Sequence, residues 1–581
     1  MLSRYSRLFH TVRYLKPGQI GWRLYYRLLR GRVSRQALAP LGPVARRRWA
    51  DAWSAPAWMP SALLGEGKAG ESKTGEREPG EWAFDFLGER GELGSAEDWN
   101  HPGKSKLWLY NLHYLDELCA QGAEERDARH RALVARWIDE NPPLAGNGWE
   151  PYALSLRLVN LVKWLSGKAG QAGEPIPAAW VASLARQTQA LSAQREYHIL
   201  ANHLFANGKA LTFAGAFLQG EDAERWLRQG LAILDAEIPE QFLADGGHFE
   251  RSPMYHATLM WDLADLIQLA ECSGLPALEG RALAWRETLV RGLAWLEMMS
   301  HPDGEIGFFN DAAFGIGPAL ADVTGYAEQL GVVPEGEAAS LITHAQSAAV
   351  VVRHAKASGY VALEWPEAGK ALLDLAPVGP DYQPGHAHAD TLSFELSLFG
   401  QRVLVNSGIS RYGEDAERHR QRSTAAHNTV VVDGENSSEV WAGFRVARRA
   451  RPGPVGIDTQ AEGVTITGSH DGYRRLPGRV VHHREWGFQK GQLVVRDRLE
   501  GRFTRAEARF HCHAGVSLAL QDPRHGELTL PDGRRLALAI EGGEAHVESA
   551  SWHPRFGESH PSQCLVVAFA APACSTAFRW A

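Results

Sequence analysis

The chain has 581 residues, of which 44% are hydrophobic and 22% are charged. This length predicts two or three domains, each with its own core. The 68 acidic and 61 basic residues give a formal net charge of −7, which argues against a general nucleic-acid-binding protein. The five cysteines are widely spaced and form no CxxC pair, which argues against a disulfide scaffold and a thiolate zinc site.

Residues 1–63 predict a basic helical segment. Eleven arginines and Lys16 precede the first acidic residue, Asp51, and apolar residues recur among them at helical spacing: Trp22, Tyr25, Tyr26 and Leu29. Such a helix either packs on the body of the protein with a solvated basic face or makes a peripheral contact with an anionic membrane. The segment lacks the uninterrupted apolar stretch of a secretory signal, so we expect a cytoplasmic location.

The rest of the chain divides by its hydrophobic period. Residues 64–81 are rich in glycine, glutamate and lysine and predict a flexible loop. From about residue 105 to 345, apolar residues recur at spacings of three and four, which predicts an all-helical domain built as a bundle, a solenoid or an α/α toroid, with its bounds at 82–345. From 346 to 581 the period changes to two without intervening helices, which predicts an antiparallel β-sandwich.

The segment PGHAHADTLSF, just before a predicted strand, carries the first candidate site. His386 and His388 alternate on an extended segment, so their side chains point to one face, where two imidazoles bind zinc if further ligands arrive. Polar packing at a strand end is the alternative. A binuclear zinc hydrolase would need a histidine in place of Thr391. Further polar candidates follow downstream: Asn406, Arg411, Tyr412 and His427.

Polar residues also stand within the predicted helices. Asn202 and His203 lie in an apolar helix, where a buried amide costs free energy unless it is paired. The stretch DGGHFERSPMYH places Glu250 after a glycine turn, and its Ser-Pro pair predicts a helix start. Tyr255 and His256 project from the first turn of that helix. Core packing is the alternative role for the tyrosine.

Five separated motifs occur in the order typical of one family: NH in a helix, DGGHFERSPMYH, HPDGEIGFFNDAA, GHAHADTLSFELSLFGQRVLVNSG and AAHNTVVVDG. On these motifs the chain resembles the heparinase II/III-like polysaccharide lyases over about residues 100–570. The resemblance implies an α/α toroid over 82–345, followed by an antiparallel β-sandwich over 346–581. It also implies a periplasmic location as the alternative to a cytoplasmic one.

The activity implied by the resemblance is β-elimination at a uronic-acid-containing anionic polysaccharide. Asn202 and His203 match the pair that meets the substrate carboxylate or acts as base. Tyr255 matches the tyrosine that protonates the leaving oxygen and can also take the C5 proton, and His386 matches a catalytic histidine. Residues near the substrate are implied as well: Glu250, His256, Arg411 and Tyr412.

The resemblance also implies one divalent metal ion, with zinc the first choice, and no organic cofactor. His388 and His427 match two of its ligands. The third ligand of the family is an aspartate, and this chain has Asn406 in that place. A neutral amide oxygen is a poorer zinc ligand than a carboxylate, so metal binding is expected to be weakened.

Two other functions stay open at this point. A glycoside hydrolase on the same toroid would need two carboxylates across a cleft, and the candidates are Asp245, Glu250, Asp303, Glu305 and Asp311. A non-catalytic glycan-binding protein of a polysaccharide synthesis or export system would need no acid or base at all. An unsaturated uronate product distinguishes the lyase from both.

Overall fold

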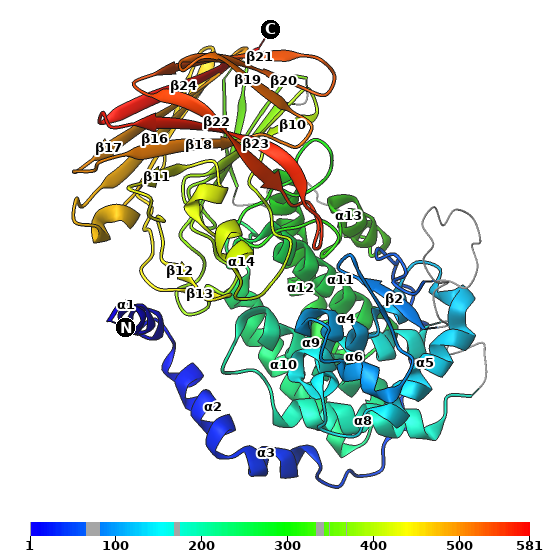
Figure 1. The fold of residues 1–581 in the computed structure, drawn as a ribbon. Coiled ribbons are helices and arrows are strands. Elements are labelled where there is room, and N and C mark those ends of the chain that lie inside the picture. Colours follow the sequence, from blue (N-terminus) through cyan, green and yellow to red (C-terminus); the bar gives the residue numbers. More distant parts are fainter. Residues whose placement is uncertain are drawn as a thin grey trace.

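The computed structural model describes residues 2–64, 82–167, 175–332, 342–347, 349–367 and 369–580. The loop expected at 64–81 lies outside these residues except for its first one. The first half is a helical toroid (Figure 1), with these helices: α4 (Lys106–Tyr114), α5 (Asp127–Glu140), α6 (Pro151–Ser166), α8 (Ala178–Ala193), α9 (Ala201–Phe217), α10 (Glu221–Gln241), α11 (Pro253–Ser273), α12 (Pro276–Met298) and α13 (Leu320–Gln329).

Consecutive helices pack in pairs, α9 against α10 and α11 against α12. The approach of α9 to α10 depends on Gly215, because a Cβ atom there would lie 2.5 Å from the backbone nitrogen of Leu227. Buried tryptophans contribute to the core between the helices. The expected helix start at the Ser-Pro pair is confirmed, since Ser252 caps α11 and Pro253 is its first residue.

The domain assigned to residues 82–345, which the sequence predicted to be all-helical, also contains short strands. Strands β2 (Ala83–Phe86) and β3 (Glu89–Glu92) form a hairpin before the first toroid helix. The two loop residues, Leu87 and Gly88, have φ angles of 61° and 73°, which is the backbone of a tight hairpin turn. Glycine adopts positive φ angles readily, but leucine rarely does, so the sequence signal for the turn was weak.

The second half is the predicted antiparallel β-sandwich, built from sheets of six, four and eight strands. Its strands are: β5 (Thr343–Gln346), β6 (Val351–Ala355), β7 (Tyr360–Trp365), β8 (Gly369–Asp374), β9 (Phe394–Leu398), β10 (Gln401–Leu404), β11 (Val430–Val432), β14 (Gly456–Gln460), β15 (Gly463–His470), β16 (Val481–Gln489), β17 (Gln492–Glu500), β18 (Ala506–His511), β19 (Ser517–Asp522), β20 (His525–Thr529), β21 (Arg535–Glu541), β22 (Glu544–Trp552), β23 (His560–Phe569) and β24 (Ala573–Arg579). One apolar cluster joins the facing sides of the three sheets.

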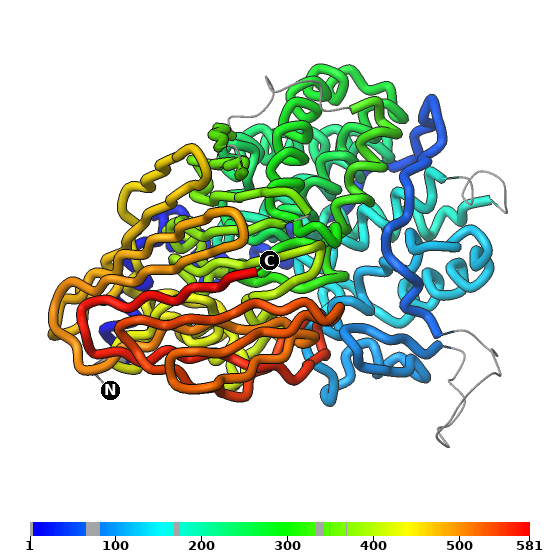
Figure 2. Tube along the Cα trace, turned by 90° about the horizontal axis from the view of Figure 1, so that it is seen from above, coloured from blue at the N-terminus to red at the C-terminus, as the bar shows by residue number. Residues whose placement is uncertain are grey.

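The N-terminal helices lie outside both halves. Figure 1 shows α1 (Leu2–Val12), α2 (Pro17–Leu28) and α3 (Arg30–Ala37) in succession, from the hairpin β12 (Val440–Trp441) and β13 (Arg445–Val446) towards α8. The chain then runs along the flank of the toroid (Figure 2), where β1 (Ala45–Arg46) pairs with β4 (Leu218–Gln219). No helix in the described part of the chain combines the length and the apolar content needed to cross a bilayer.

Backbone contacts join the toroid to the sandwich. The Asp311 N–H donates to the carbonyl of His386 at 2.9 Å. The guanidinium of Arg251 donates to the carbonyl of Ser358, and the Tyr360 hydroxyl donates to the carbonyl of Arg251, each at 2.9 Å. The turns after α10 and α12 are therefore fixed against the first strands of the sandwich, and this seam carries the polar residues that the sequence singled out.

Candidate active site

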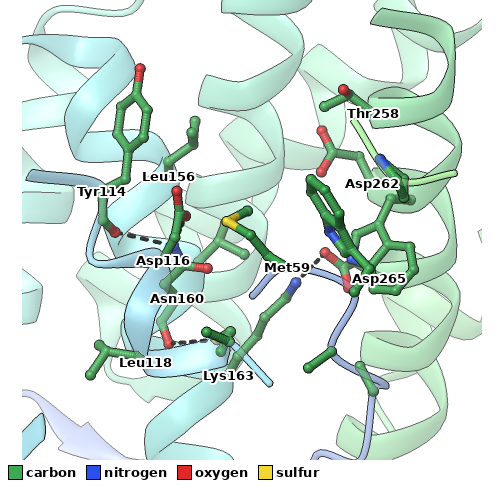
Figure 3. A pocket seen from close by; sticks show the side chains of 18 of the residues that line it. Met59, Tyr114, Asp116, Leu118, Leu156, Asn160, Lys163, Thr258, Asp262 and Asp265 are labelled. Atoms are coloured by element: carbon green, nitrogen blue, oxygen red, sulfur yellow. Dashed lines mark hydrogen bonds and ion pairs between the residues drawn. The ribbon is translucent and has the colours of Figure 1, made fainter. Parts of the chain in front are cut away.

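A cavity of about 720 Å³ lies in the toroid. Its walls come from α4, α6, α9, α11 and residues 53–59, and Tyr412 and Phe556 of the sandwich border one end. Figure 3 shows the part of the cavity where Lys163 on α6 points to Asp265 on α11. Asn202 and Tyr255 also line the cavity, so it reaches the seam between the two halves.

Tyr255 stands at the seam because the cap of α11 fixes its backbone, with the Tyr255 N–H donating to the Ser252 hydroxyl at 3.2 Å. Its phenol oxygen lies 2.8 Å from that of Tyr412. Its ring lies against His386, with 3.8 Å between the ring centroids. Burial, helped by Tyr412, raises the pKa of Tyr255 well above its usual value of 10.0, so the phenol keeps its proton at neutral pH.

A single carboxylate organises the histidines. Asp311 lies 3.0 Å from Nδ1 of His386 and 2.8 Å from Nε2 of His388, and Arg418 grips both of its oxygens. Burial alone would raise the pKa of Asp311, but Arg418 and the histidines hold it well below 3.8. Because the ionised carboxylate only accepts hydrogen bonds, His386 carries its proton on Nδ1. Its Nε2 is then the nitrogen able to accept a proton.

Polar groups from α9 and the turn after α10 stand beside this pair. His203 lies 3.0 Å from the Glu196 carboxylate. Burial lowers the pKa of His203, but Glu196 outweighs it and the net shift is upward. The oxygen of the buried Asn202 amide has no hydrogen-bond partner in the described part of the chain. Glu250 lies 3.7 Å from Nε2 of His386, and burial raises the pKa of its carboxyl.

A group with metal-ligand geometry adjoins the site. His388, Asp390 and His427 are all buried, and one potential ligand atom from each lies within 4.8 Å of the others. Nδ1 of His388 and Nε2 of His427 are 3.2 Å apart. Burial lowers the pKa of His388 to about 4 and that of His427 well below 6.5, so both imidazoles are neutral at neutral pH. Two neutral imidazoles and one carboxylate form a ligand set that suits zinc.

The side chain of Asn406 is hydrogen-bonded to backbone groups on both sides. Its amide nitrogen donates to the carbonyl of Phe308 at 2.8 Å, and its amide oxygen accepts from the N–H of Asn428 at 3.1 Å. The side chain is thus taken up by backbone groups at the strand ends. Asp390, which belongs to the same HAHAD segment as His388, is the carboxylate in the group with metal-ligand geometry, and the expected role of Asn406 as a ligand stays a prediction.

Two further residues lie away from the reacting groups. His256 is fully buried, with Nε2 2.8 Å from the carbonyl of Gly292 and Nδ1 accepting from the His248 N–H at 3.2 Å. Both of its ring nitrogens are thus paired within the protein, and it is not among the residues that line the cavity. Arg411 is exposed and lies 3.6 Å from Asp415, whereas its neighbour Tyr412 lines the cavity.

The carboxylates proposed for a hydrolase are mostly engaged elsewhere. Asp245 accepts from the backbone N–H of Ser358 at 2.7 Å, and Asp303 pairs with Arg402 at 2.6 Å. Asp311 is held by Arg418 and the histidines, as described above. Glu250 alone among these carboxylates stands beside His386 without a side-chain donor in the described part of the chain. Among the described residues, Asp245, Asp303 and Asp311 are therefore paired with donors, and these three do not form the pair of opposed free carboxylates that a glycosidase requires.

Sequence reasoning missed four residues that build the site. They are Glu196, Asp390 and Arg418, and Asp311 in its role of orienting the histidines. Asp390 had a signal, since it follows His388 by two residues and so shares its face on an extended segment. Arg418 had no sequence signal, because it is 107 positions away from Asp311 in the chain and the two residues meet only in the folded protein.

Family models match both halves of the chain in order. The heparinase II/III N-terminus model matches residues 132–330, and the heparinase II/III-like C-terminal model matches residues 350–581. Among curated proteins, the heparin-sulfate lyase of Bacteroides thetaiotaomicron is 23% identical over 338 residues, which cover 52% of this chain and 47% of that protein. FtsZ-localized protein C of Caulobacter vibrioides is 26% identical over 391 residues, covering 64% and 61%. The chain thus spans about half the length of the first relative and about three fifths of the second.

Solved structures give the same architecture. A crystal structure of heparinase III superposes with a TM-score of 0.65 at 16% identity, covering 85% of this chain and 79% of that one. The heparan sulfate lyase HepC from Pedobacter heparinus superposes with a TM-score of 0.52 at 18% identity, covering 85% and 80%. At these identities the likeness concerns the fold. Since both halves match family models in the same order and on the same fold, the chain belongs to the heparinase II/III-like family.

Proposed function

We propose that the protein is a polysaccharide lyase that cleaves a uronic-acid-containing anionic polysaccharide by β-elimination. The observation that carries this proposal is the contact between Tyr255 of the toroid, which lines the cavity, and His386 of the sandwich, with 3.8 Å between the ring centroids. An acid and a base within one ring contact suit a reaction that takes one proton and returns another. The names of the heparin-sulfate lyase relatives point the same way.

The proton movements balance within this pair. Nε2 of His386 takes the C5 proton, the C5–H electron pair forms the C4–C5 double bond, and the C4–O bond breaks. The phenol of Tyr255 donates its proton to the departing oxygen. Tyr255 is suited to this acid role because its raised pKa keeps it protonated. The proton on His386 then has a short path back to the tyrosine, which restores both groups.

The remaining groups serve the substrate carboxylate, whose neutralisation lowers the barrier to loss of the adjacent proton. The Asn202 amide and the protonated His203 are hydrogen-bond donors for it. Glu250 adds a third donor in its protonated form, which burial favours. Tyr412 holds the phenol of Tyr255 in place through their shared hydrogen bond.

We propose that His388, Asp390 and His427 hold one divalent metal ion, with zinc the first choice. Two imidazoles and a buried carboxylate are ligands that zinc prefers. Asp311 orients His388 through the hydrogen bond to its Nε2, the ring nitrogen that does not face His427. The ion supplies positive charge that ties three buried ligands of the sandwich together. The proton transfers proposed above use His386 and Tyr255 only.

The charges in the cavity favour a substrate without sulfate groups. Two lysines, Lys163 and Lys209, line it, and the described lining contains no arginine. Five carboxylates line it as well: Asp116, Glu124, Glu125, Asp262 and Asp265. Both lysines already pair with Asp265. A sulfate in this cavity would meet an excess of negative charge, whereas sugar hydroxyls would find carboxylate acceptors.

The proposal is tested with a panel of uronate polysaccharides and the ultraviolet absorbance of the unsaturated product. Wild type should generate product from at least one of them, and Tyr255→Phe should lower kcat by about 10²–10⁴-fold. Tyr110→Phe is the matched control, because Tyr110 bonds to Glu150 and does not line the cavity. Undiminished turnover by Tyr255→Phe would remove the tyrosine from the acid role.

A second candidate function follows from the relative named FtsZ-localized protein C, whose name records a location and no reaction. In that case the chain would be a non-catalytic binding protein on a lyase fold. The same panel separates the two functions, since a binding protein gives no unsaturated product from any polymer. The assembled group of Tyr255, His386 and Asp311 favours the lyase.

A further inference from the structure

Exposed apolar side chains gather on the N-terminal helices. In the described part of the chain, twelve large hydrophobic residues are exposed, and nine of them fall between residues 5 and 38: Tyr5, Leu8, Phe9, Val12, Ile20, Leu24, Leu28, Leu29 and Leu38. Tyr5, Phe9 and Leu28 are 67%, 65% and 74% exposed. Such clustering marks an interaction surface, since singly scattered apolar residues are the norm elsewhere.

The spacing of these residues forms stripes. On α1, Tyr5, Leu8, Phe9 and Val12 follow the i, i+3, i+4, i+7 pattern of one helix face. On α2, the residues at i, i+4 and i+8 continue the pattern: Ile20, Leu24 and Leu28. Both helices therefore present an apolar line to solvent.

The opposite side of α2 is anchored on the protein. The buried amide of Gln19 donates to the carbonyls of Ile199 and Tyr382, at 3.2 and 3.3 Å. Trp22 stacks on Tyr197 with 5.1 Å between ring centroids. On α1, the Thr11 side chain bonds to the hairpin residue Trp441 at 3.1 Å. The helices are thus held at a fixed place, and the leucines point outward because other residues make the contacts to the body.

Positive charge accompanies the apolar stripes. Eight exposed arginines occupy residues 4–35: Arg4, Arg7, Arg13, Arg23, Arg27, Arg30, Arg32 and Arg35. None of the ion pairs among the described residues engages them. Twelve of the 61 basic residues precede Asp51, while all 68 acidic residues start there or later. The protein is negative overall, but this surface is strongly positive.

We propose that α1 and α2 dock the protein on the surface of a membrane rich in anionic lipids. Apolar residues at helical spacing enter the boundary between headgroups and acyl chains, while arginines bind the lipid phosphates. Charge complementarity selects this occupant, since a second copy of the chain would bring two arginine-rich surfaces together. A nucleic acid would satisfy the arginines but leave the nine apolar side chains in water.

The test is cosedimentation of the full chain with vesicles of phosphatidylcholine alone and with vesicles of equal parts phosphatidylcholine and phosphatidylglycerol. Wild type should bind the mixed vesicles at least about tenfold more strongly than the neutral ones. The double variant Phe9→Ser, Leu24→Ser should lower the binding constant by about tenfold or more. The matched control is Leu283→Ser, an exposed leucine on α12, which should bind as wild type does.

A second variant separates the charge contribution. Arg7→Glu with Arg27→Glu should also abolish the preference for the mixed vesicles, because both positions are exposed and lie on α1 and α2. Equal binding to both kinds of vesicle, or unchanged binding by the double serine variant, would overturn the proposal. Binding of an oligonucleotide that survives the serine substitutions while vesicle binding is absent would overturn it in favour of a nucleic-acid surface.

Discussion

The phenol oxygens of Tyr255 and Tyr412 lie 2.8 Å apart across the seam between the toroid and the sandwich. One tyrosine comes from the first turn of α11, and the other from the loop after β10. Tyr412 therefore controls where the proposed acid points without itself adjoining His386 closely, since their ring centroids are 6.2 Å apart.

Tyr412→Phe should lower kcat by about tenfold, which is less than the loss expected for Tyr255→Phe, because it removes the hydrogen bond but leaves the acid in place. KM should change little, since the ring still lines the cavity. Initial rates of product absorbance check this. A loss equal to that of Tyr255→Phe would mean that Tyr412 itself donates the proton.

Glu196→Gln should shift the alkaline side of the pH–rate profile towards lower pH. Glu196 raises the pKa of His203 above 6.5, so activity that needs protonated His203 is present below that raised pKa and lost as pH rises through it. Without the carboxylate, burial lowers the pKa and the loss begins earlier. The profile of kcat/KM measures this, with Glu240→Gln, an exposed carboxylate away from the cavity, as control.

Metal content should distinguish Asp390 from Asn406. Asp390→Ala or His427→Ala should remove most of the bound zinc, as measured by elemental analysis after dialysis, because each deletes one of three proposed ligands. Asn406→Ala should keep the zinc but lower the free energy of unfolding by about 1–3 kcal/mol, since it leaves buried backbone groups unpaired. Loss of zinc in Asn406→Ala with retention in Asp390→Ala would reverse this assignment.

The stability of the protein should fall as pH drops from 6.5 towards 4, and His256 should account for part of the fall. Burial lowers its folded pKa from 6.5 to about 4, so between these values the unfolded chain binds more protons and is favoured by up to about 3 kcal/mol. Urea unfolding at several pH values checks this. The slope of stability against pH should be shallower in His256→Gln. An unchanged slope would contradict the assignment.

A uronate polymer should be cleaved with a kcat/KM at least about tenfold higher than its chemically O-sulfated derivative, because sulfates meet the carboxylates of the cavity. Asp116 is one of them, and burial raises its pKa to about 6. Asp116→Asn should lower the ratio of kcat/KM for the unsulfated polymer to kcat/KM for the sulfated one. A preference for the sulfated form would contradict the charge argument while leaving the lyase proposal intact.

Much of the fold was predictable from local patterns. The change from a helical to an alternating period located the junction near residue 345, and β5 begins at Thr343. The hairpin β2–β3 escaped because its turn uses Leu87 at positive φ. The junction could be predicted because the hydrophobic period follows from which residues are buried. The hairpin could not, because a single leucine at positive φ produces no recognisable sequence pattern.

The site was only partly predictable. Motifs identified Tyr255 and His386, and the structure brings them into ring contact. Asn406 was expected to be a weak metal ligand from its position in the motif, and sequence could not show that its amide is also hydrogen-bonded to two backbone groups. The partnership of Asp311 with Arg418 depends on two elements meeting across the seam, which no local pattern records.

The ion pair between Asp311 and Arg418 also restricts how a polymer could enter the cavity. Arg418 and Asp311 are fully buried and oppositely charged, and they lie on the two sides of the seam. Separating them would leave two buried charges without a partner, at a cost of several kcal/mol. A hinge motion that separates the toroid from the sandwich is therefore disfavoured. A polysaccharide substrate of the proposed lyase would then have to reach Tyr255 through the cavity while the toroid and the sandwich stay together.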